Sequence, residues 1–214
     1  MLDPFVIAFE GTDCTGKSHL TKMVKSILEK KGYKVEIVPI LNGPLRSVIL
    51  DKSDYYSEEE RTIMLRLDAV ATTRKIDTLV SNGTCVIMDR GPLTIYAYQG
   101  YAMQMSDVVC DMDEGLIESL SSDNVIQPDY TVVVTSNSYV LEKRLKDKEK
   151  DHYEEKGLGF IIKAAAGFQN AIENNITPMA AIDNSNCLTM VEMEEAVDIY
   201  LENIEHFRLL ARLG

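Results

Sequence analysis

The stretch "FEGTDCTGKSHL", Phe9–Leu20, decides the fold of this chain. From Gly11 to Ser18 it fills every position of the pattern Gly-x-x-x-x-Gly-Lys-Ser/Thr. A short apolar run with β-branched residues, "PFVIAF", precedes the pattern, and apolar residues at helical spacing follow it. A strand, this loop and a helix in that order are the context in which the pattern marks a phosphate-binding loop. The sequence therefore predicts a buried strand that leads into a loop for a nucleoside triphosphate.

The chemistry of the loop follows from its residue types. Glycines let backbone N–H groups turn toward a phosphate, and the following helix adds its positive end. Lys17 brings a charge to the β- and γ-phosphates, and the Ser18 hydroxyl can ligate Mg²⁺. A guanine-reading Asn-Lys-x-Asp motif is missing from the chain, which argues against a GTPase. ATP is therefore the nucleoside triphosphate that we expect this loop to bind. The residues expected to bind ATP are Gly11, Thr12, Asp13, Cys14, Thr15, Gly16, Lys17, Ser18 and His19.

The rest of the chain alternates between apolar runs and helical patterns. Further strands are predicted at 33–40, 84–90, 129–136 and 178–185. This alternation predicts an α/β fold, with a parallel sheet and helices on both faces. Repeats and Pro/Gly/Ser linkers are missing, so residues 1–214 are predicted to form one domain. Helices are predicted at 16–32, 57–83, 94–120 in two pieces, 137–157 with a charged second half, 160–175 and 190–210.

Composition narrows the class of protein. The net charge of −12 argues against a basic face for nucleic acid. The N-terminus lacks the basic region of a signal peptide, and no apolar run approaches the length of a membrane span. The four cysteines have no CxxC spacing, which is typical of reduced thiols in the cytoplasm.

A second informative stretch is "VIMDRGPLTIYAYQG", Val86–Gly100. At the carboxyl end of a parallel strand, Asp89 and Arg90 are expected to emerge in the crevice beside the phosphate loop. Asp89 would then hold Mg²⁺ directly or through water, and Arg90 would grip a phosphate. An Asp-Arg pair alone is usually a surface ion pair. Together with "AYQG" at residues 97–100, however, it forms a combination that is specific enough to indicate a functional site.

Together, "FEGTDCTGKS", "MDRGPLTIYAYQG", "PDYTVVVTS" and "KDHYEEKGLGF" resemble the thymidylate kinase family, whose members are P-loop kinases of deoxynucleoside monophosphates. The last stretch is similar to the family's mobile lid, placed here at about residues 144–158. The resemblance implies a P-loop NTPase fold with a five-stranded parallel sheet and a short lid. It also implies transfer of the ATP γ-phosphoryl group to a nucleotide 5′-phosphate, and commonly a homodimer.

The resemblance also implies roles at the acceptor side. Asp13 would lie near the acceptor, and Arg90 would hold the acceptor phosphate and help keep the two anions apart. Tyr98 would pack against the deoxyribose, where a 2′-hydroxyl would be crowded. The residues expected to bind the acceptor are Asp13, Pro39, Arg46, Met64, Asp68, Arg90, Thr94, Tyr98 and Gln99.

Two departures from the family concern the acceptor. After the second strand the family's basic segment is replaced by "IVPILNG", and Arg46 is the nearest substitute. The family's helix arginine that reads the thymine O4 falls at Asp68 or next to it. A carboxylate accepts hydrogen bonds, so it would suit an amino group or hydroxyl on a modified base. Alternatively, the position of the family's arginine lies one helical turn away from Asp68, and Asp68 is a solvated helix residue.

Two further departures concern the pocket shape and the catalytic charge. Gly91-Pro92 replaces the usual aromatic residue after Asp-Arg, which reshapes the pocket. The family's catalytic arginine is missing from the phosphate loop, and its lid position is His152. Lys17, Arg90 and Asp13 are therefore expected to be catalytic together with Lys146, Lys148 or His152; the alternative for the lid lysines is a solvated charged helix.

The sequence thus favours ATP-dependent phosphorylation of a pyrimidine deoxynucleoside 5′-monophosphate, with dTMP as the default acceptor. One alternative acceptor is a modified pyrimidine such as 5-hydroxymethyl-dUMP, or a modified base in DNA. A modified pyrimidine would suit a virus that alters its DNA bases, with host cytoplasm as the location, whereas the net charge of −12 argues against a base within DNA. A non-catalytic nucleotide-binding relative is the alternative of another class.

Overall fold

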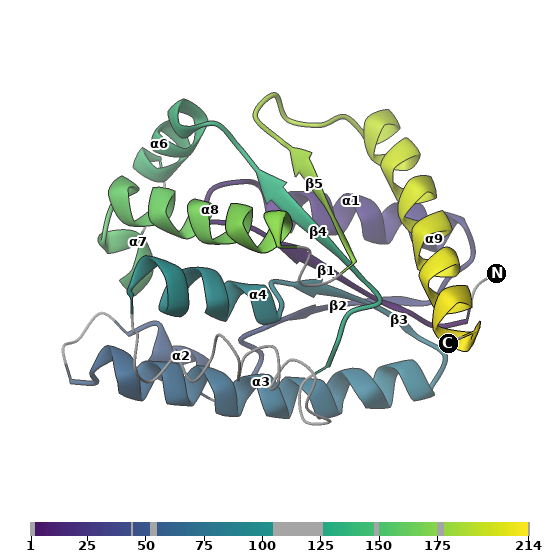
Figure 1. The fold of residues 1–214 in the computed structure, drawn as a ribbon, viewed down its shortest axis with the longest axis horizontal. Helices are drawn as coiled ribbons and strands as arrows, with labels where there is room; N and C mark the ends of the chain where they lie inside the picture. The colour runs from purple at the N-terminus through teal and green to yellow at the C-terminus, as the bar shows by residue number, and fades with distance from the viewer. Residues whose placement is uncertain are drawn as a thin grey trace.

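The computed structural model describes residues 3–43, 45–51, 55–104, 126–147, 150–174 and 178–213. These residues include a five-stranded sheet in the order β2-β3-β1-β4-β5, and every neighbouring pair is parallel (Figure 1). The predicted five-stranded parallel sheet is therefore confirmed. The strands are β1 (Val6–Glu10), β2 (Val35–Pro39), β3 (Cys85–Asp89), β4 (Tyr130–Thr135) and β5 (Met179–Asp183).

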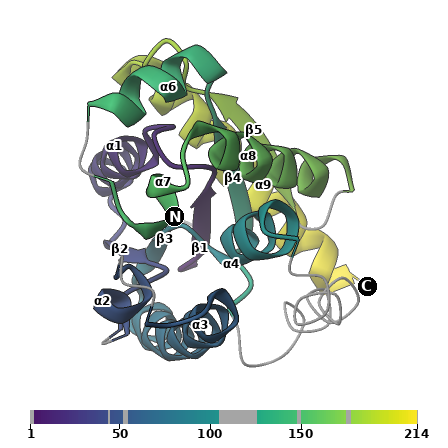
Figure 2. The same cartoon turned by 90° about the vertical axis from the view of Figure 1, so that its left-hand side faces the viewer.

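Helices cover both faces of the sheet, as the alternation predicts. Helices α1 and α9 pack on one face through the largest apolar cluster, and α3, α4 and α8 pack on the other (Figures 1 and 2). Along β1, buried apolar side chains pack alternately on one face of the sheet and on the other, because successive residues of a strand point to opposite faces. The helices of the described residues are α1 (Lys17–Lys30), α2 (Arg46–Ile49), α3 (Glu58–Ser81), α4 (Pro92–Ile95), the π-helix η1 (Tyr96–Ala102), α6 (Ser138–Lys146), α7 (His152–Glu155), α8 (Leu158–Glu173) and α9 (Met190–Leu213).

A local sequence signal accounts for the start of helix α3, whereas two other predicted helices differ from the structure. The Ser57 hydroxyl and the Glu60 carboxylate form a capping box at the start of α3. Of the helix predicted at 94–120, the described part starts earlier, at Pro92, and continues from α4 into η1; residues 105–120 lie outside the described residues. The charged segment 137–157 is interrupted: α6 ends at Lys146, and α7 is a separate short helix.

The topology gathers both sequence motifs at one edge of the sheet. Central strand β1 lies between β3 and β4, with Phe9 opposite Asp89 across the β1–β3 pair. The arrowheads of β1, β4 and β5 point toward the side of the molecule where α6 and α7 lie (Figure 1). Within the described ranges, none of the helices is long and apolar enough to cross a membrane.

Candidate active site

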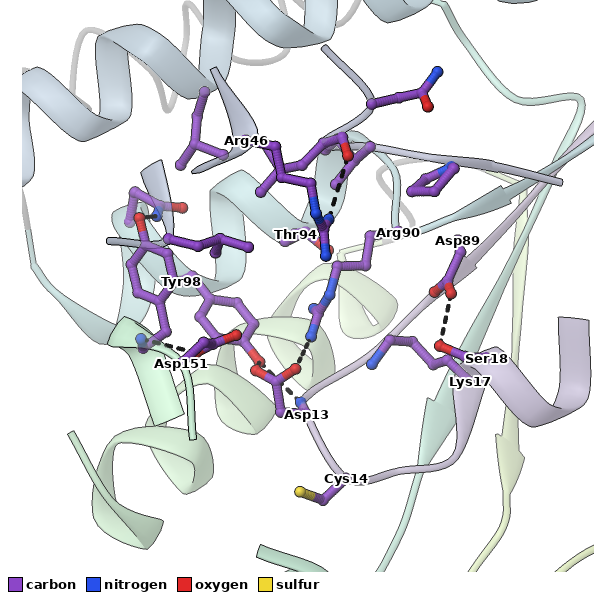
Figure 3. A pocket seen from close by; sticks show the side chains of 18 of the residues that line it. Asp13, Cys14, Lys17, Ser18, Arg46, Asp89, Arg90, Thr94, Tyr98 and Asp151 are labelled. Carbon is purple, nitrogen blue, oxygen red and sulfur yellow. Dashed lines mark hydrogen bonds and ion pairs between the residues drawn. The ribbon is translucent and has the colours of Figure 1, made fainter. Parts of the chain in front are cut away.

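The carboxyl ends of β1, β2 and β3 face a cavity of about 560 Å³. Its walls come from the phosphate loop, the segment after β2, the end of β3, helix η1 and the residues around α7. Figure 3 shows the side chains that reach into this space. The described residues thus bring together the two sequence motifs and the predicted lid segment 144–158 around one cavity.

The phosphate loop has the backbone shape that its glycines predict. Gly11 adopts φ +130°, and a Cβ atom there would lie 2.2 Å from the Val134 carbonyl oxygen. Gly16 and Cys14 also have positive φ values, +93° and +66°. Helix α1 begins directly after Gly16, so its unpaired N–H groups are available to a phosphate. This part of the chain therefore forms a cradle for anions.

Lys17 is buried beneath the loop, and its ammonium donates to the Thr12 carbonyl at 2.5 Å. Burial and the nearby positive charge of Arg90 together lower the pKa of Lys17 to about 7, against the raising effect of Asp13 and Asp89. An anion in the cradle would oppose both lowering effects. Lys17 is thus able to respond to a phosphate by taking up a proton.

The Ser18 hydroxyl donates to Asp89 Oδ2 at 2.7 Å. This pair joins the start of α1 to the end of β3. The contact is expected, because β1, which leads into α1, lies parallel to β3. A hydroxyl and a carboxylate are hard oxygen donors, and Mg²⁺ commonly uses only one or two protein oxygens while it keeps several waters. The residues present therefore fit a magnesium ion beside a nucleotide.

Asp13 is held by two partners on the other side of the loop. Arg90 forms an ion pair with its carboxylate and donates to the Gly11 carbonyl at 3.0 Å. The Tyr98 hydroxyl donates to Asp13 Oδ2 at 2.6 Å and accepts the Asp13 amide at 2.9 Å. Burial opposes the charge of Arg90, but Asp13 outweighs it and raises the Arg90 pKa. Burial, with the charge of Asp13, raises the pKa of Tyr98, so its hydroxyl remains a donor.

Sequence reasoning missed the buried carboxylate of Glu10, the last residue of β1. Glu10 Oε1 accepts from the amides of Gly91 and Leu93 at 2.9 Å each, and Oε2 accepts from the Thr94 hydroxyl at 2.6 Å. Burial raises the pKa of Glu10, against the lowering effect of these hydrogen bonds. Glu10 therefore ties the start of α4 to the central strand, which sets where Arg90 and η1 lie.

Sequence reasoning also missed Arg144, at the end of α6. Its guanidinium donates to the Cys14 carbonyl at 2.9 Å and to the Asn184 carbonyl at 3.1 Å. The Asn184 side chain in turn donates to the Thr15 carbonyl at 2.7 Å. Arg144 thus joins the phosphate loop to the loop after β5. A basic residue in a charged helix carries no local signal for contacts that are 130 residues away in the chain.

Neither of the two described lid candidates for catalytic charge, Lys146 and His152, reaches the cavity. The exposed Lys146 pairs with Glu142 at 2.7 Å, one turn earlier on α6. His152 Nε2 is hydrogen-bonded to Glu58 Oε1 at 2.9 Å, and neither Lys146 nor His152 lines the cavity. Lys148 lies outside the described residues. Asp151 and Tyr153, which sequence reasoning left out, do line the cavity, and the Tyr153 hydroxyl accepts from Gln99 at 3.2 Å.

Most of the residues expected at the acceptor gather at the cavity. Asp68 is instead enclosed, with 1% of its surface exposed, so the alternative of a solvated helix residue is wrong. Among the expected ATP-binding residues, Thr12 and Thr15 are buried within the loop and His19 is exposed. Met64 and Asp68 do not line the cavity, whereas their neighbour Leu65 does. The predicted residues that line it are Asp13, Cys14, Gly16, Lys17, Ser18, Pro39, Arg46, Asp89, Arg90, Thr94, Tyr98 and Gln99.

Comparison with known proteins gives matches over most of the chain. The family model described as Thymidylate kinase matches residues 9–193. A protein named Thymidylate kinase from Thermoanaerobacter sp. (strain X514) is 25% identical over 199 residues, which cover 90% of this chain and 95% of that protein. A protein of the same name from Thermosipho africanus is 29% identical over 164 residues, which cover 73% of this chain and 79% of that protein.

Proposed function

The chain belongs to the thymidylate kinase family, and on this basis we propose that it transfers the γ-phosphoryl group of ATP to the 5′-phosphate of dTMP. One observation carries the proposal. The Lys17, Ser18 and Asp89 side chains line the same cavity as Arg90, Asp13 and Tyr98, so a triphosphate bound at the first group would adjoin an anion bound at the second. Phosphoryl transfer depends mainly on this kind of positioning and charge neutralisation.

At the donor end, the loop amides and Lys17 would bind the β- and γ-phosphates of ATP. Ser18 and Asp89 would hold Mg²⁺, which when bound neutralises charge on the phosphate oxygens. The buried position of Lys17 favours this role, because a phosphate would restore a charge that burial disfavours.

At the acceptor end, two arginines would share the 5′-phosphate. Arg90 and Arg46 both line the cavity, and both guanidinium groups reach toward its middle in Figure 3. A guanidinium can donate two parallel hydrogen bonds to a phosphate. Arg46 would replace the basic segment that the chain lacks after β2. The ring of Tyr98, 5.2 Å from the Arg90 guanidinium carbon, would border the deoxyribose.

Lys17, Arg90 and Arg46 would supply the charge that stabilises the transferring phosphoryl group. Two of the lid candidates have acidic partners of their own, Glu142 for Lys146 and Glu58 for His152. Asp13 would act by holding Arg90 and Tyr98 in place. Catalytic charge would then come from the cavity walls and not from Lys146 or His152.

A modified pyrimidine is the second candidate acceptor, and one polar atom in the cavity wall favours it. Gln99 lines the cavity, and its Oε1 atom is buried with no hydrogen-bond partner among the described residues. An acceptor oxygen of this kind would accept from a base hydroxyl or N–H group. A 5-hydroxymethyl group is one such donor.

Steady-state kinase assays at fixed ATP would test the proposed function. The acceptors would be dTMP, dUMP, dCMP and 5-hydroxymethyl-dUMP, with an oligonucleotide duplex that carries 5-hydroxymethyluracil. The highest kcat/KM is expected for dTMP. A higher value for 5-hydroxymethyl-dUMP, or transfer to the duplex, would replace dTMP with that acceptor. ATP binding without transfer to any acceptor would indicate a non-catalytic relative.

We also propose a homodimer, as the family resemblance implies. Ile63 and Leu67 are large apolar residues one turn apart on α3, and both are exposed. Light scattering after size-exclusion chromatography would give about twice the chain mass of 24.0 kDa. A mass equal to that of one chain across the micromolar range would contradict the homodimer.

A further inference from the structure

The carboxylate of Asp68 is enclosed between helix α3 and the segment that follows β2. Its Oδ2 atom accepts the backbone amides of Asn42 and Gly43 at 3.0 and 3.2 Å. Its Oδ1 atom is also buried, with no partner among the described residues. Gly43 covers Oδ1 so closely that a Cβ atom on Gly43 would lie 2.0 Å from it. Asp68 is thus turned toward the backbone of this segment and away from the cavity.

The same face of α3 holds the chain at a second point. Thr72, one turn after Asp68, is buried, and its hydroxyl donates to the Ile40 carbonyl at 3.1 Å. Thr72 therefore holds Ile40, and Asp68 holds the amides of Asn42 and Gly43, two and three residues further along the chain. We refer to residues 41–46 as the β2–α2 segment; Pro44 within it lies outside the described residues.

Two hydrogen bonds between described residues join Arg46 to the rest of the β2–α2 segment. The Arg46 amide donates to the Gly43 carbonyl at 3.3 Å. Its guanidinium donates to the Leu41 carbonyl, also at 3.3 Å, and reaches into the cavity from there (Figure 3). Leu41, Asn42 and Arg46 all line the cavity, whereas Asp68 does not. A chain of contacts thus runs from Asp68 through Gly43 to Arg46.

We propose that Asp68 is a positioning residue that holds the β2–α2 segment and thereby sets Arg46 toward the acceptor phosphate. Asp68 lies at or beside the helix position from which the family's arginine reads the base, yet its bonds go to backbone amides. The proposal rests on the proposed function, because it takes the cavity to hold a nucleotide monophosphate. Asp68 would then affect every acceptor to the same degree, because all acceptors share the phosphate.

Two substitutions at Asp68 separate positioning from base reading. Asp68→Ala removes the acceptor of two amides and is expected to raise the acceptor KM about tenfold or more, with the KM for ATP unchanged. Asp68→Asn keeps one carbonyl oxygen that can accept both amides, so it is expected to stay within about threefold of wild type. In both variants the ratio of kcat/KM among dTMP, dUMP and dCMP is expected to match wild type. A changed ratio in Asp68→Asn would overturn the proposal in favour of base reading.

A double-mutant cycle with Arg46→Ala tests whether Asp68 acts through that arginine. If it does, Asp68→Ala adds less than about twofold to the acceptor KM of the Arg46→Ala variant, because the positioned group is already gone. Independent, multiplicative effects of the two substitutions would overturn the proposal. If Asp68→Ala is too unstable to purify, Gly43→Ala takes its place in the cycle with Arg46→Ala. A Cβ atom on residue 43 would lie 2.0 Å from Asp68 Oδ1 and so would disturb the same contact.

Hydrogen exchange supplies a readout that does not depend on turnover. The Asn42 and Gly43 amides are expected to exchange faster in Asp68→Ala and at the wild-type rate in Asp68→Asn. Unchanged exchange in Asp68→Ala would overturn the proposal. A wild-type protein that phosphorylates no monophosphate would count against the proposed function, whereas the exchange result would still report on the anchoring by Asp68.

Discussion

The Tyr98 hydroxyl is bonded twice to Asp13, because it donates to the carboxylate and accepts the backbone amide of the same residue. This double contact ties helix η1 to the phosphate loop across the cavity. The Tyr98 ring also packs edge-on against Tyr153, Phe160 and Phe168, so the hydroxyl is held by a rigid aromatic group. If the cavity holds a nucleotide acceptor as proposed, the carboxylate in the phosphate loop would serve the acceptor side.

Tyr98→Phe is expected to raise the acceptor KM about tenfold. The substitution removes two hydrogen bonds, one accepted from the Asp13 amide and one donated to the Asp13 carboxylate, a loss of about 1–2 kcal/mol. Tyr96→Phe is the matched control, because Tyr96 donates its hydroxyl to Asn170 from the same helix without lining the cavity. Steady-state kinetics with both variants check this. Equal acceptor KM values for the two variants would count against a role for the Tyr98 hydroxyl.

Affinity for ATP is expected to fall as the pH rises from about 7.5 to about 9. In the free protein burial lowers the Lys17 pKa to about 7, so Lys17 is largely neutral in this range. The phosphates of ATP favour its charged form and raise its pKa, so the complex binds more protons than the free protein. Binding then takes up a proton, and the dissociation constant rises with pH by at most about tenfold per unit.

Isothermal titration calorimetry in buffers of different ionisation enthalpy measures this proton uptake directly. Work above about pH 7.5 keeps the triphosphate itself ionised, so the proton is taken up by the protein. The variant Lys17→Met is expected to bind ATP more weakly and to lose the dependence on buffer. Proton release on binding, or an affinity that rises with pH, would contradict the assignment to Lys17.

The sequence predicts this fold well where the signal is local. Apolar runs and helical spacing locate each strand, and the phosphate loop pattern identifies the turn from β1 into α1, because these features depend on neighbouring residues. The Ser57–Glu60 capping box is another such feature. The meeting of Asp89 with Ser18 was also predictable, since the carboxyl ends of parallel strands share an edge.

What the sequence does not carry is the direction of a polar side chain toward a distant partner. Glu10 reads as the end of an apolar strand, yet it caps a helix 81 residues further on. Asp68 lies on α3, within the predicted helix, but its carboxylate turns to the β2–α2 segment. His152 occupies the lid position of an arginine and bonds to Glu58 instead. Each of these choices depends on packing between elements far apart in the chain.

Arg144→Ala is expected to raise the KM for ATP about tenfold and to leave the acceptor KM unchanged. The guanidinium donates to the carbonyls of Cys14 and Asn184, so its loss loosens both loops at the donor end. Lys143→Ala is the matched control, because Lys143 is the exposed neighbour on the same helix. Kinetics at varied ATP check the difference. A larger effect on the acceptor KM than on the ATP KM would contradict the assignment to the donor end.

Glu58→Gln is expected to loosen α7 and to lower kcat/KM for the acceptor about fivefold. Glu58 Oε1 is bonded to both His152 Nε2 and Lys156 Nζ, at 2.9 and 2.6 Å, so one carboxylate joins α3 to both ends of α7. Burial opposes its charge, but the hydrogen bonds from Lys156 and His152 outweigh burial and lower the Glu58 pKa. The stabilisation is therefore present above the ordinary pKa of about 4.5 and is lost as the pH falls through the lowered value. Partial exposure limits its size to about 1 kcal/mol.

Hydrogen exchange over residues 151–157 measures the docking of α7 separately from catalysis. Faster exchange is expected in Glu58→Gln at neutral pH, whereas Glu59→Gln, at the exposed next position, is expected to leave exchange unchanged. Because Asp151 and Tyr153 line the cavity, the looser helix would lower kcat/KM for the acceptor and leave ATP binding alone. Equal exchange in the two variants would show that α7 is held by its apolar contacts, and the role of Glu58 would then be refuted.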